Sequence, residues 1–473
     1  MSTWRTVLRL EWRILRRDRA ALVILALFAG FLVLAAIAGG QHAETLATGL
    51  NRSASAETER LAGHRSALDA LSSGDTPLGA RDPRDAVWMG QQGAARLAVL
   101  PPAPLAPVAV GQRQLHPQAV RVSTDAQLTA ERETETAMSG PTRLRTGAFD
   151  PAFLFVVLFP LVIIALSYEL LSGERERGTL AMLLSQPVTQ SQLVLGKAGA
   201  RAIALCVVTL GFAWLGLLVA GADLSAEDAW LHVGLYAAVL VAWALFWFAA
   251  AVAVNAWGQT SASNALTLVG LWLVVVIVVP GLLHVAVDTL YPPPSRIELL
   301  HEAREAGQDV ERELAGLKGR HDVDTSTTGF AKRVVAVEEA LARRTTPVVT
   351  ELRDQLNRRQ AMVDTWRFLS PAILVQLALE DVAGSGAVRH QRFEAQVDAF
   401  HENYRDFFFD RIRREVRLTA ADLDELPTPA FEEEPAAVLV WRVVTGVLGL
   451  LLFVGLLVGV AWPGLQRVGR LTR

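Results

Sequence analysis

Residues 167–201 read SYELLSGERERGTLAMLLSQPVTQSQLVLGKAGAR and lie between two long apolar segments. The stretch holds four basic residues, a Gly-Thr pair that favours the start of a helix, and Pro187, which favours a helix end. An apolar chain that leaves the membrane, forms a short helix and returns at once is predicted to build a rigid element on the inner face. We call residues 172–200 the foot.

The composition indicates an integral membrane protein with sizeable soluble parts. Of 473 residues, 52% are hydrophobic and 20% are charged, and charged residues are absent from several long windows. A net charge of −3 gives no basic field of the kind that attracts nucleic acid. The single cysteine, Cys206, excludes an intrachain disulfide and a thiolate metal site.

Six apolar segments are long enough to cross a hydrocarbon core of ~30 Å. Basic residues gather at 1–19, 172–200 and 464–473, whereas the short outer turn at 223–228 holds none. The positive-inside rule therefore puts both termini, and the tail 464–473, in the cytoplasm. The predicted fold class is an all-α polytopic membrane protein with spans at 20–43, 151–171, 201–222, 231–254, 265–290 and 436–463.

Three of these spans carry a local feature that bears on their structure. The first span has a rival interpretation as a cleaved signal peptide, because Ala36-Ile37-Ala38 resembles a cleavage site. Its apolar run exceeds the usual signal-peptide core of about 7–15 residues, which favours a retained helix. Pro160 and Pro280 are predicted to kink the second and fifth spans without ending them.

Residues 1–19 are predicted to form an amphipathic helix in the plane of the inner headgroups. Trp4 and Trp12 fall on its apolar side at helical spacing, and Arg5, Arg9 and Arg13 can extend towards anionic lipid. The alternative is a positively charged flank of the first span.

Two polar regions, 44–150 and 291–435, are predicted to lie outside the membrane. The first begins as a helix over 44–72, then becomes Pro-rich and alternating, so we expect mixed α/β structure. The second is predicted to be helical at 296–318, 331–368 and 387–418, and an aromatic stripe on its last helix indicates a bundle core. The apolar stretch 371–380 is too short to span, and either is buried or rests on the outer leaflet.

No nucleotide, metal or catalytic site is predicted in this chain. Leu195-Gly196-Lys197 is similar to the end of a phosphate-binding loop, but Ser191 replaces the earlier glycine and Ala198 replaces the magnesium-binding Ser/Thr. The nine histidines show no i,i+4 pair, and only five methionines are present, which argues against copper or zinc. We therefore expect no cofactor in this chain and no enzymatic activity.

The foot is the best candidate for a contact with another protein. Gly178 and Thr179 start its short helix. We expect its apolar face to enter a cleft on a partner, and its charged residues to pair with the rim of that cleft and set the register. The apolar face is Leu180, Leu183 and Leu184, and the charged residues are Glu174, Arg175, Glu176 and Arg177. The alternative is an ordinary inner loop whose charges only anchor topology.

The chain resembles the permeases of type 2 ABC transporters. The foot motifs GERERGTL and LLSQPVTQSQLVLGK resemble their cytoplasmic coupling loop, and residues 143–187 resemble a second span and exit in the subgroup named for multi-copper enzyme maturation. The stretches LPPAPLAPVAVGQRQLHP and FLSPAILVQLALEDVAGSGAVRHQRFEAQVDAFH are similar to the two outer regions of an uncharacterised part of that subgroup.

This resemblance implies a subunit of an exporter in the bacterial inner membrane. It implies two six-helix permeases, identical or related, and a cytoplasmic ABC ATPase dimer that binds ATP and magnesium. The coupling element would include Glu174, Gly178, Thr179 and Leu180, and residues 1–19 would be the interfacial elbow. The sparse histidine and methionine content gives no support for copper transport.

Three functions were weighed on these grounds. A permease driven by a separate ATPase, with the lipid bilayer and a possible periplasmic protein as further partners, accounts for the six spans, the foot and the missing nucleotide site. A membrane sensor or scaffold with a periplasmic ligand- or protein-binding helical domain is the alternative, but the inner segments are too short for a cytoplasmic output domain. A membrane enzyme lacks a catalytic constellation.

Overall fold

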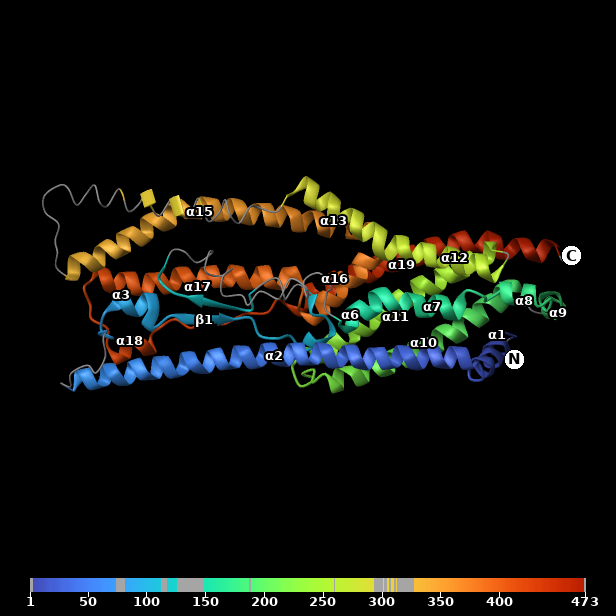
Figure 1. Cartoon of the computed structure of the whole chain (residues 1–473), viewed down its shortest axis with the longest axis horizontal. Coiled ribbons are helices and arrows are strands. Elements are labelled where there is room, and N and C mark those ends of the chain that lie inside the picture. Colours follow the sequence, from blue (N-terminus) through green and yellow to red (C-terminus); the bar gives the residue numbers. More distant parts are fainter. Residues whose placement is uncertain are drawn as a thin grey trace.

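The molecule is elongated, with both chain ends at the same end of the long axis (Figure 1). The computed structural model describes residues 3–73, 81–111, 117–125, 149–186, 189–258, 260–292 and 327–471, with isolated residues between 301 and 312. One half is a bundle of apolar helices, and the other half is a headpiece formed by the two polar regions (Figure 1). The predicted helical period at 296–318 and the link at 319–329 lie mostly outside the described residues.

The prediction of six membrane-spanning helices is confirmed. Six helices in the described residues are long and apolar enough to cross a membrane, with mean hydropathies of 2.4–2.9 in their most apolar windows. They are α2 (Arg19–Ser72), α6 to α8 (Pro151–Glu176), α10 (Gln190–Val219), α11 (Ala229–Trp257), α12 to α13 (Ser261–Leu290) and α19 (Ala436–Leu471). The chain is an all-α polytopic membrane protein, and its described residues include one small two-stranded sheet.

Helix α11 forms the centre of the bundle, and 72% of its most apolar 18-residue stretch is buried within the chain. Trp243 and Trp247 on this helix are fully enclosed by the surrounding spans. The span Ser261–Leu290 is the opposite case, because only 11% of its most apolar 18-residue stretch is buried within the chain. Its apolar side chains must therefore face lipid or another protein.

Both predicted kink sites are preceded by π-helical turns. In the second span, α6 (Pro151–Phe153) continues as the π-helix η4 (Leu154–Leu158) and then α7 (Phe159–Ser167). Pro160 has no N–H to donate to a preceding carbonyl, and the indole Nε1 of Trp243 donates to Phe155 O at 2.8 Å. A side chain of a neighbouring helix thus satisfies a carbonyl beside the proline.

The fifth span repeats this arrangement. Its helix α12 (Ser261–Trp272) passes through the π-helix η5 (Leu273–Val278) into α13 (Val279–Leu290), which contains Pro280. A π-turn widens the helix just before the proline ring, where a regular α-turn would clash with a carbonyl. Each span remains one continuous crossing.

Two of the spanning helices extend beyond the predicted spans. Helix α2 does not stop near residue 43 but runs as one rod of 54 residues, so the helical segment expected at 44–72 continues the first span. Helix α19 runs past residue 463 to Leu471, with Pro463 inside it. The polarity of the sequence marks where each helix leaves the lipid, but hydrogen bonding along the backbone carries the helix further.

The two outer regions pack into one headpiece rather than two separate units. From the first region come α3 (Ala86–Trp88), η1 (Met89–Gly93) and an antiparallel pair, β1 (Arg96–Val99) and β2 (Ala119–Val122). These surround the aromatic stripe of α17 (Ala387–Arg413), where Phe393, Tyr404 and Phe408 are buried. The stripe is a packing core, as its spacing predicts.

The remaining headpiece helices are tied to this core by charge. Helix α15 (Thr327–Trp366) lies along α17 and is joined to it by an ion pair from Arg353 to Asp398 at 2.5 Å. Helix α18 (Ala420–Asp424) begins with a capping box formed by Thr419 and Asp422. Partial burial opposes ionisation of this carboxyl, but hydrogen bonds from Thr419 and Arg411 outweigh it and lower the pKa of Asp422.

Helix α16 (Pro371–Ala383) joins the headpiece to the bundle. It follows the short helix η6 (Arg367–Leu369) and packs against α11, α19 and η2 (Ala106–Val108). Most of its side chains are buried, so of the two predicted alternatives for this stretch the buried helix is correct. His232 of α11 hydrogen-bonds to Val382 O at 2.7 Å, which helps to fix α16 against the spans.

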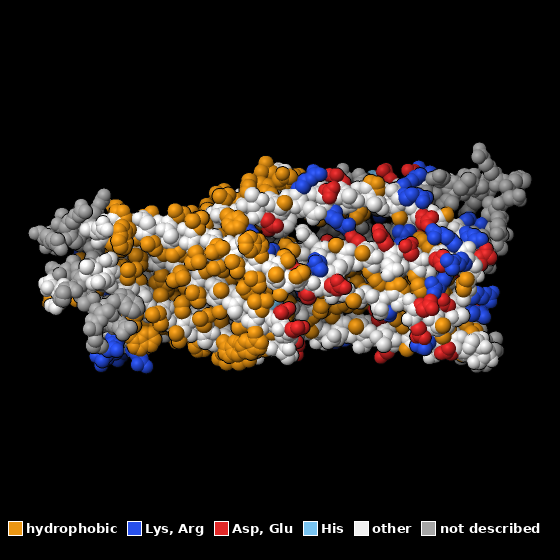
Figure 2. Space-filling model, turned by 180° about the vertical axis from the view of Figure 1, so that it is seen from behind, with side chains coloured by type: hydrophobic (Ala, Val, Ile, Leu, Met, Phe, Trp, Pro, Cys, Tyr) orange, Lys and Arg blue, Asp and Glu red, His pale blue; other side chains and the backbone are white. Residues whose placement is uncertain are grey.

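The surface divides into an apolar half and a charged half (Figure 2). Exposed tryptophans mark the limits of the apolar half: Trp230 and Trp257 on α11, and Trp441 and Trp462 on α19. The α19 pair is separated by 21 positions, which corresponds to about 32 Å of helix, close to the thickness of a hydrocarbon core. Tryptophans at both ends of this width are typical of the two interfaces of a membrane.

Candidate functional site: the foot and its attachments

The foot consists of two short helices followed by the start of the third span. They are α8 (Ser172–Glu176) and α9 (Leu180–Leu184), and Gly178 between them adopts a left-handed φ of +71° that favours glycine. Thr189 and Gln192 form the predicted capping box, and α10 starts at the next residue after Thr189, as predicted. The foot is therefore a turn with a left-handed glycine between its two short helices and a capping box where α10 begins.

Glu174 fastens the foot to α10. Its Oε1 accepts a hydrogen bond from Lys197 Nζ at 2.7 Å, and its other carboxylate oxygen accepts one from the Thr179 hydroxyl. Arg177 adds a longer ion pair at 3.7 Å. Because the Lys197 side chain is 7% exposed and the Glu174 side chain 17%, this pair lies largely out of water, where charge pairing is strong.

The same lysine connects the foot to the N-terminal helix α1 (Thr3–Leu15). Glu11 of α1 is buried, and its carboxylate lies 3.5 Å from Lys197 Nζ and 4.0 Å from Arg201. Arg201 also donates to Leu166 O at the end of the second span. Two acids and two bases thus join α1, the foot and the second and third spans in one ionic cluster.

The other two charged residues of the α8 helix fasten the foot to the inner turn between α11 and α12. Arg175 Nη1 donates to Gly258 O at 2.8 Å. The carboxylate of Glu176 accepts from the backbone N–H of Ser261 at 2.6 Å and from its hydroxyl at 2.9 Å. The four predicted charged residues therefore contact their own chain, although Glu176 and Arg177 are exposed, Arg177 at 59% of its side chain.

A buried amide pair supports this attachment from within. Asn255 Oδ1 accepts from Leu171 N at 3.2 Å, and its Nδ2 donates to Ser167 O at 3.1 Å. Asn264 Nδ2 reaches Asn255 Oδ1 at 3.1 Å and Ser172 Oγ at 3.2 Å. Both asparagines are fully buried, so these bonds form in a low-dielectric setting and fix where the second span ends.

The apolar face of α9 points inward, which corrects the expected contact. Leu180 is buried and Leu183 is partly buried against the bundle core, so neither is free to enter a partner. The side chain of Leu184 lies outside the described residues. Among the described side chains at the tip, Met182 is an apolar group with 65% exposure, and Gln186 is exposed as well.

Helix α1 is only partly the interfacial helix that its sequence predicts. Trp12 packs against the bundle core rather than facing outward. The side chains of Trp4 and Arg5 lie outside the described residues. The exposed side chains are Arg9, Leu10, Arg13 and Ile14, a mixture of basic and apolar groups that suits the boundary between lipid and water.

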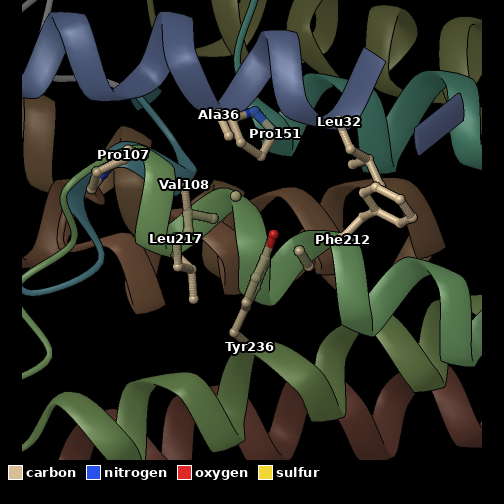
Figure 3. Close-up of a pocket in the computed structure, with 11 residues that line it drawn as sticks. Leu32, Ala36, Pro107, Val108, Pro151, Phe212, Leu217 and Tyr236 are labelled. Carbon is tan, nitrogen blue, oxygen red and sulfur yellow. The ribbon is translucent and has the colours of Figure 1, made fainter. Parts of the chain in front are cut away.

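A small apolar cavity lies between α2, α10, α11 and η2, at the outer end of the bundle (Figure 3). Its empty space is about 270 Å³, part of it open to the surroundings. The lining includes Leu32, Ala36, Val108, Phe212, Leu217 and Tyr236, and no charged side chain. The cavity holds none of the polar groups that would orient a ligand, apart from the Tyr236 hydroxyl.

Several residues of this site were not predicted from the sequence. Glu11 is the one acid within the α1 helix, and Lys197 is one of only three lysines in the chain, but neither pattern indicates a partner. Asn255 and Asn264 stand in the polar inner turn, where their position suggested only a loop. Among the described residues, no group of three His, Cys, Asp or Glu side chains is placed to hold a metal ion.

The architecture agrees with the similarity of the sequence to known proteins. Two curated relatives, each called "Probable ABC transporter permease protein NosY", come from Pseudomonas aeruginosa and Stutzerimonas stutzeri. They are 39% identical over 67 residues and 39% over 70, or 14% and 15% of this chain. The matches span about a quarter of each relative's length, 24% and 25%. A family model described as "ABC-2 family transporter protein" matches residues 5–455. The chain therefore belongs to the ABC-2 family of transporter proteins.

Proposed function

We propose that this chain is the permease subunit of an ABC exporter, driven by a separate cytoplasmic ABC ATPase that binds ATP and magnesium. The observation that carries the proposal is the foot: a short turn between two spans, fastened by charged side chains to α1, to α10 and to the inner turn between α11 and α12, with an exposed tip. Family membership supports the transport role, and the attachments of the foot support the coupling role.

The attachments make the foot suited to transmit force. A push on α8 acts on α10 through Glu174 and Lys197, on α1 through Glu11, and on the inner turn of α11 and α12 through Glu176. Elements joined in this way move as one body rather than deforming individually. Closure of an ATPase pair would then shift several spans together.

The contact with the ATPase is assigned to the tip of the foot rather than to its leucines. Met182 is 65% exposed and the Arg177 side chain 59% exposed, and both lie on the cytoplasmic side in the proposed topology. A methionine adapts its shape to an apolar cleft, and an arginine at the rim sets register by charge.

The proposed setting is the bacterial inner membrane with both termini in the cytoplasm and the headpiece in the periplasm. Its test is labelling with an impermeant maleimide in intact cells. Ser73→Cys, at the far end of α2, should react, and Ser185→Cys, in the foot, should react only after the cells are opened. If Ser185→Cys alone reacts in intact cells, the topology is the opposite of the proposed one.

A second permease, identical or related, is the proposed partner within the membrane, and a periplasmic protein is a proposed partner of the headpiece. The weakly buried span Ser261–Leu290 offers the surface for the second permease, since Leu266, Leu282 and Val285 are 77%, 64% and 61% exposed within the chain. Chemical crosslinking of Leu266→Cys in membranes should give a dimer if this surface is used.

Co-purification with the ABC ATPase encoded beside this gene tests the coupling role. Met182→Asp places a charge on the exposed tip without touching the ionic cluster, so it should reduce association and ATP hydrolysis while the permease stays folded. Val416→Asp, at 46% exposed in the headpiece, is the matched control and should bind as wild type does. If both variants bind the ATPase equally well, the tip has no role in binding the ATPase, which contradicts the proposal.

A further inference from the structure

The headpiece contains two buried N–H groups, Arg60 Nε and Trp88 Nε1, that have no acceptor among the described residues, although Arg60 Nη2 donates to Ala95 O. We propose that the surface formed by Arg60, Trp88 and Arg121 binds an oxyanion, the carboxylate or phosphate group of a ligand on the outer side of the membrane. This inference concerns the headpiece alone and is independent of the proposed coupling by the foot.

Two buried donors carry the proposal. Arg60 Nε and Trp88 Nε1 are both shielded from solvent, and neither meets an acceptor among the residues that the structure describes. A buried donor without an acceptor is unfavourable, so such groups generally have a bound partner. The two residues are linked through His64, which lies one helical turn after Arg60 on α2 and packs edge-on against the Trp88 ring, with 5.2 Å between the ring centroids.

The charge of the surroundings indicates an anion rather than a neutral partner. Arg96 and Arg121 both lie close enough to Arg60 to lower the pKa of its guanidinium, although burial contributes most. The opposing acid is Glu57, and it is already engaged by Arg96 Nη1 at 3.0 Å and by Leu97 N at 2.7 Å. The site therefore keeps surplus positive charge that a water molecule would not neutralise.

The pKa of His64 responds to the same field. Burial lowers it first, and the positive charge of Arg60 lowers it further. A neutral imidazole beside Trp88 leaves the arginines as the charged groups of the site.

The site has a half-buried floor and an open rim. Arg60, His64 and Trp88 are partly buried, whereas Arg81, Gln92 and Arg121 are exposed. Two of the rim side chains meet there, since Arg81 Nη1 donates to Gln92 Oε1 at 2.6 Å and its guanidinium lies 5.9 Å from the Trp88 ring. Within the part of the chain that the structure describes, the contact of Arg121 is a long one of 3.5 Å to Gln92 O, so its guanidinium is available to a bidentate oxyanion.

The test measures thermal unfolding of the full-length protein in detergent, titrated with sodium phosphate or sodium acetate at constant ionic strength made up with chloride. Binding predicts a saturable rise of about 2 °C in the unfolding temperature of the wild type. A general salt effect predicts a rise that continues linearly with concentration. Saturation with phosphate alone assigns phosphate, and saturation with acetate as well assigns the shared oxyanion chemistry.

Four variants locate the effect. Arg60→Gln and Arg121→Gln should lose the saturable rise, and Arg52→Gln, an exposed arginine earlier on α2, should keep it. Trp88→Phe removes an unpaired N–H and keeps an aromatic ring, so without phosphate it should be neutral or slightly stabilising. With phosphate it should gain less than the wild type.

The proposal is overturned if no saturable rise occurs, which would leave water as the partner of these donors. It is also overturned if Arg60→Gln and Arg121→Gln respond as strongly as Arg52→Gln.

Discussion

Replacing Lys197 by methionine removes the cation at the centre of the ionic cluster while keeping much of the side-chain volume. Lys197 Nζ lies 2.7 Å from Glu174 and 3.5 Å from Glu11, and the Glu11 side chain is only 5% exposed. The substitution leaves two carboxylates close to each other with weaker partners. Removing one member of a buried ion pair typically costs about 3–5 kcal/mol, because the remaining charge is not compensated.

The structure reduces this figure for Lys197. Glu174 keeps the Thr179 hydroxyl and the longer contact with Arg177, and Glu11 keeps Arg201 at 4.0 Å. We therefore expect a loss of about 2–3 kcal/mol in the free energy of unfolding. Adding Glu174→Gln to Lys197→Met removes one stranded charge, so the double variant should recover about 1 kcal/mol or more.

The assay is reversible unfolding in mixed detergent micelles, followed by the fluorescence of the 12 tryptophans. Arg177→Met is the matched control, because it removes a charge from the same carboxylate at an exposed position and should cost less than about 1 kcal/mol. If Lys197→Met is no more destabilising than Arg177→Met, or the double variant is worse than Lys197→Met alone, the cluster does not hold the foot.

Two further perturbations test the packing and the electrostatics elsewhere. A Cβ added at Gly258 would overlap Asn264 Oδ1, so Gly258→Ala should destabilise the protein by more than about 2 kcal/mol. Gly270 has open space around it, so Gly270→Ala should be neutral or stabilising. Thermal unfolding of both variants measures the difference. Because folding lowers the pKa of Asp422, this carboxylate stabilises the folded protein at pH values above the ordinary aspartate pKa of about 4. That stabilisation is lost as the pH falls through the lower pKa of the folded state. Asp422→Asn should therefore lower stability at pH 7 and flatten its decline below about pH 4, whereas exposed Asp424→Asn should leave the slope unchanged.

Much of the membrane half could be predicted from the sequence because its signals are local. The length of an apolar run decides whether a helix can cross the membrane, and a Thr–Gln capping box decides where α10 begins. The two span prolines indicated distortions, and the π-helical turns before Pro160 and Pro280 are found there. The carbonyl contact from Trp243 was not foreseeable, because it comes from another span.

The parts that escaped prediction depend on contacts between distant segments. Glu11 and Lys197 are far apart in the chain, and no spacing rule connects them. The periodicity of α9 correctly assigns Leu180 to the apolar face of the helix, and Leu180 is buried. A helical pattern does not say whether that face packs against its own chain or against a partner. The single headpiece likewise forms from two regions whose local patterns are independent.

The central claim is that the tip of the foot touches the ATPase. A photoreactive amino acid in place of Met182, in membranes that contain the ATPase, tests this contact most directly, with Leu266 on the membrane-facing span as the control position. We expect an ATP-sensitive crosslink to the ATPase from position 182 and none from position 266. Absence of a crosslink from position 182 in an assembled, ATP-hydrolysing complex would show that the tip does not touch the ATPase.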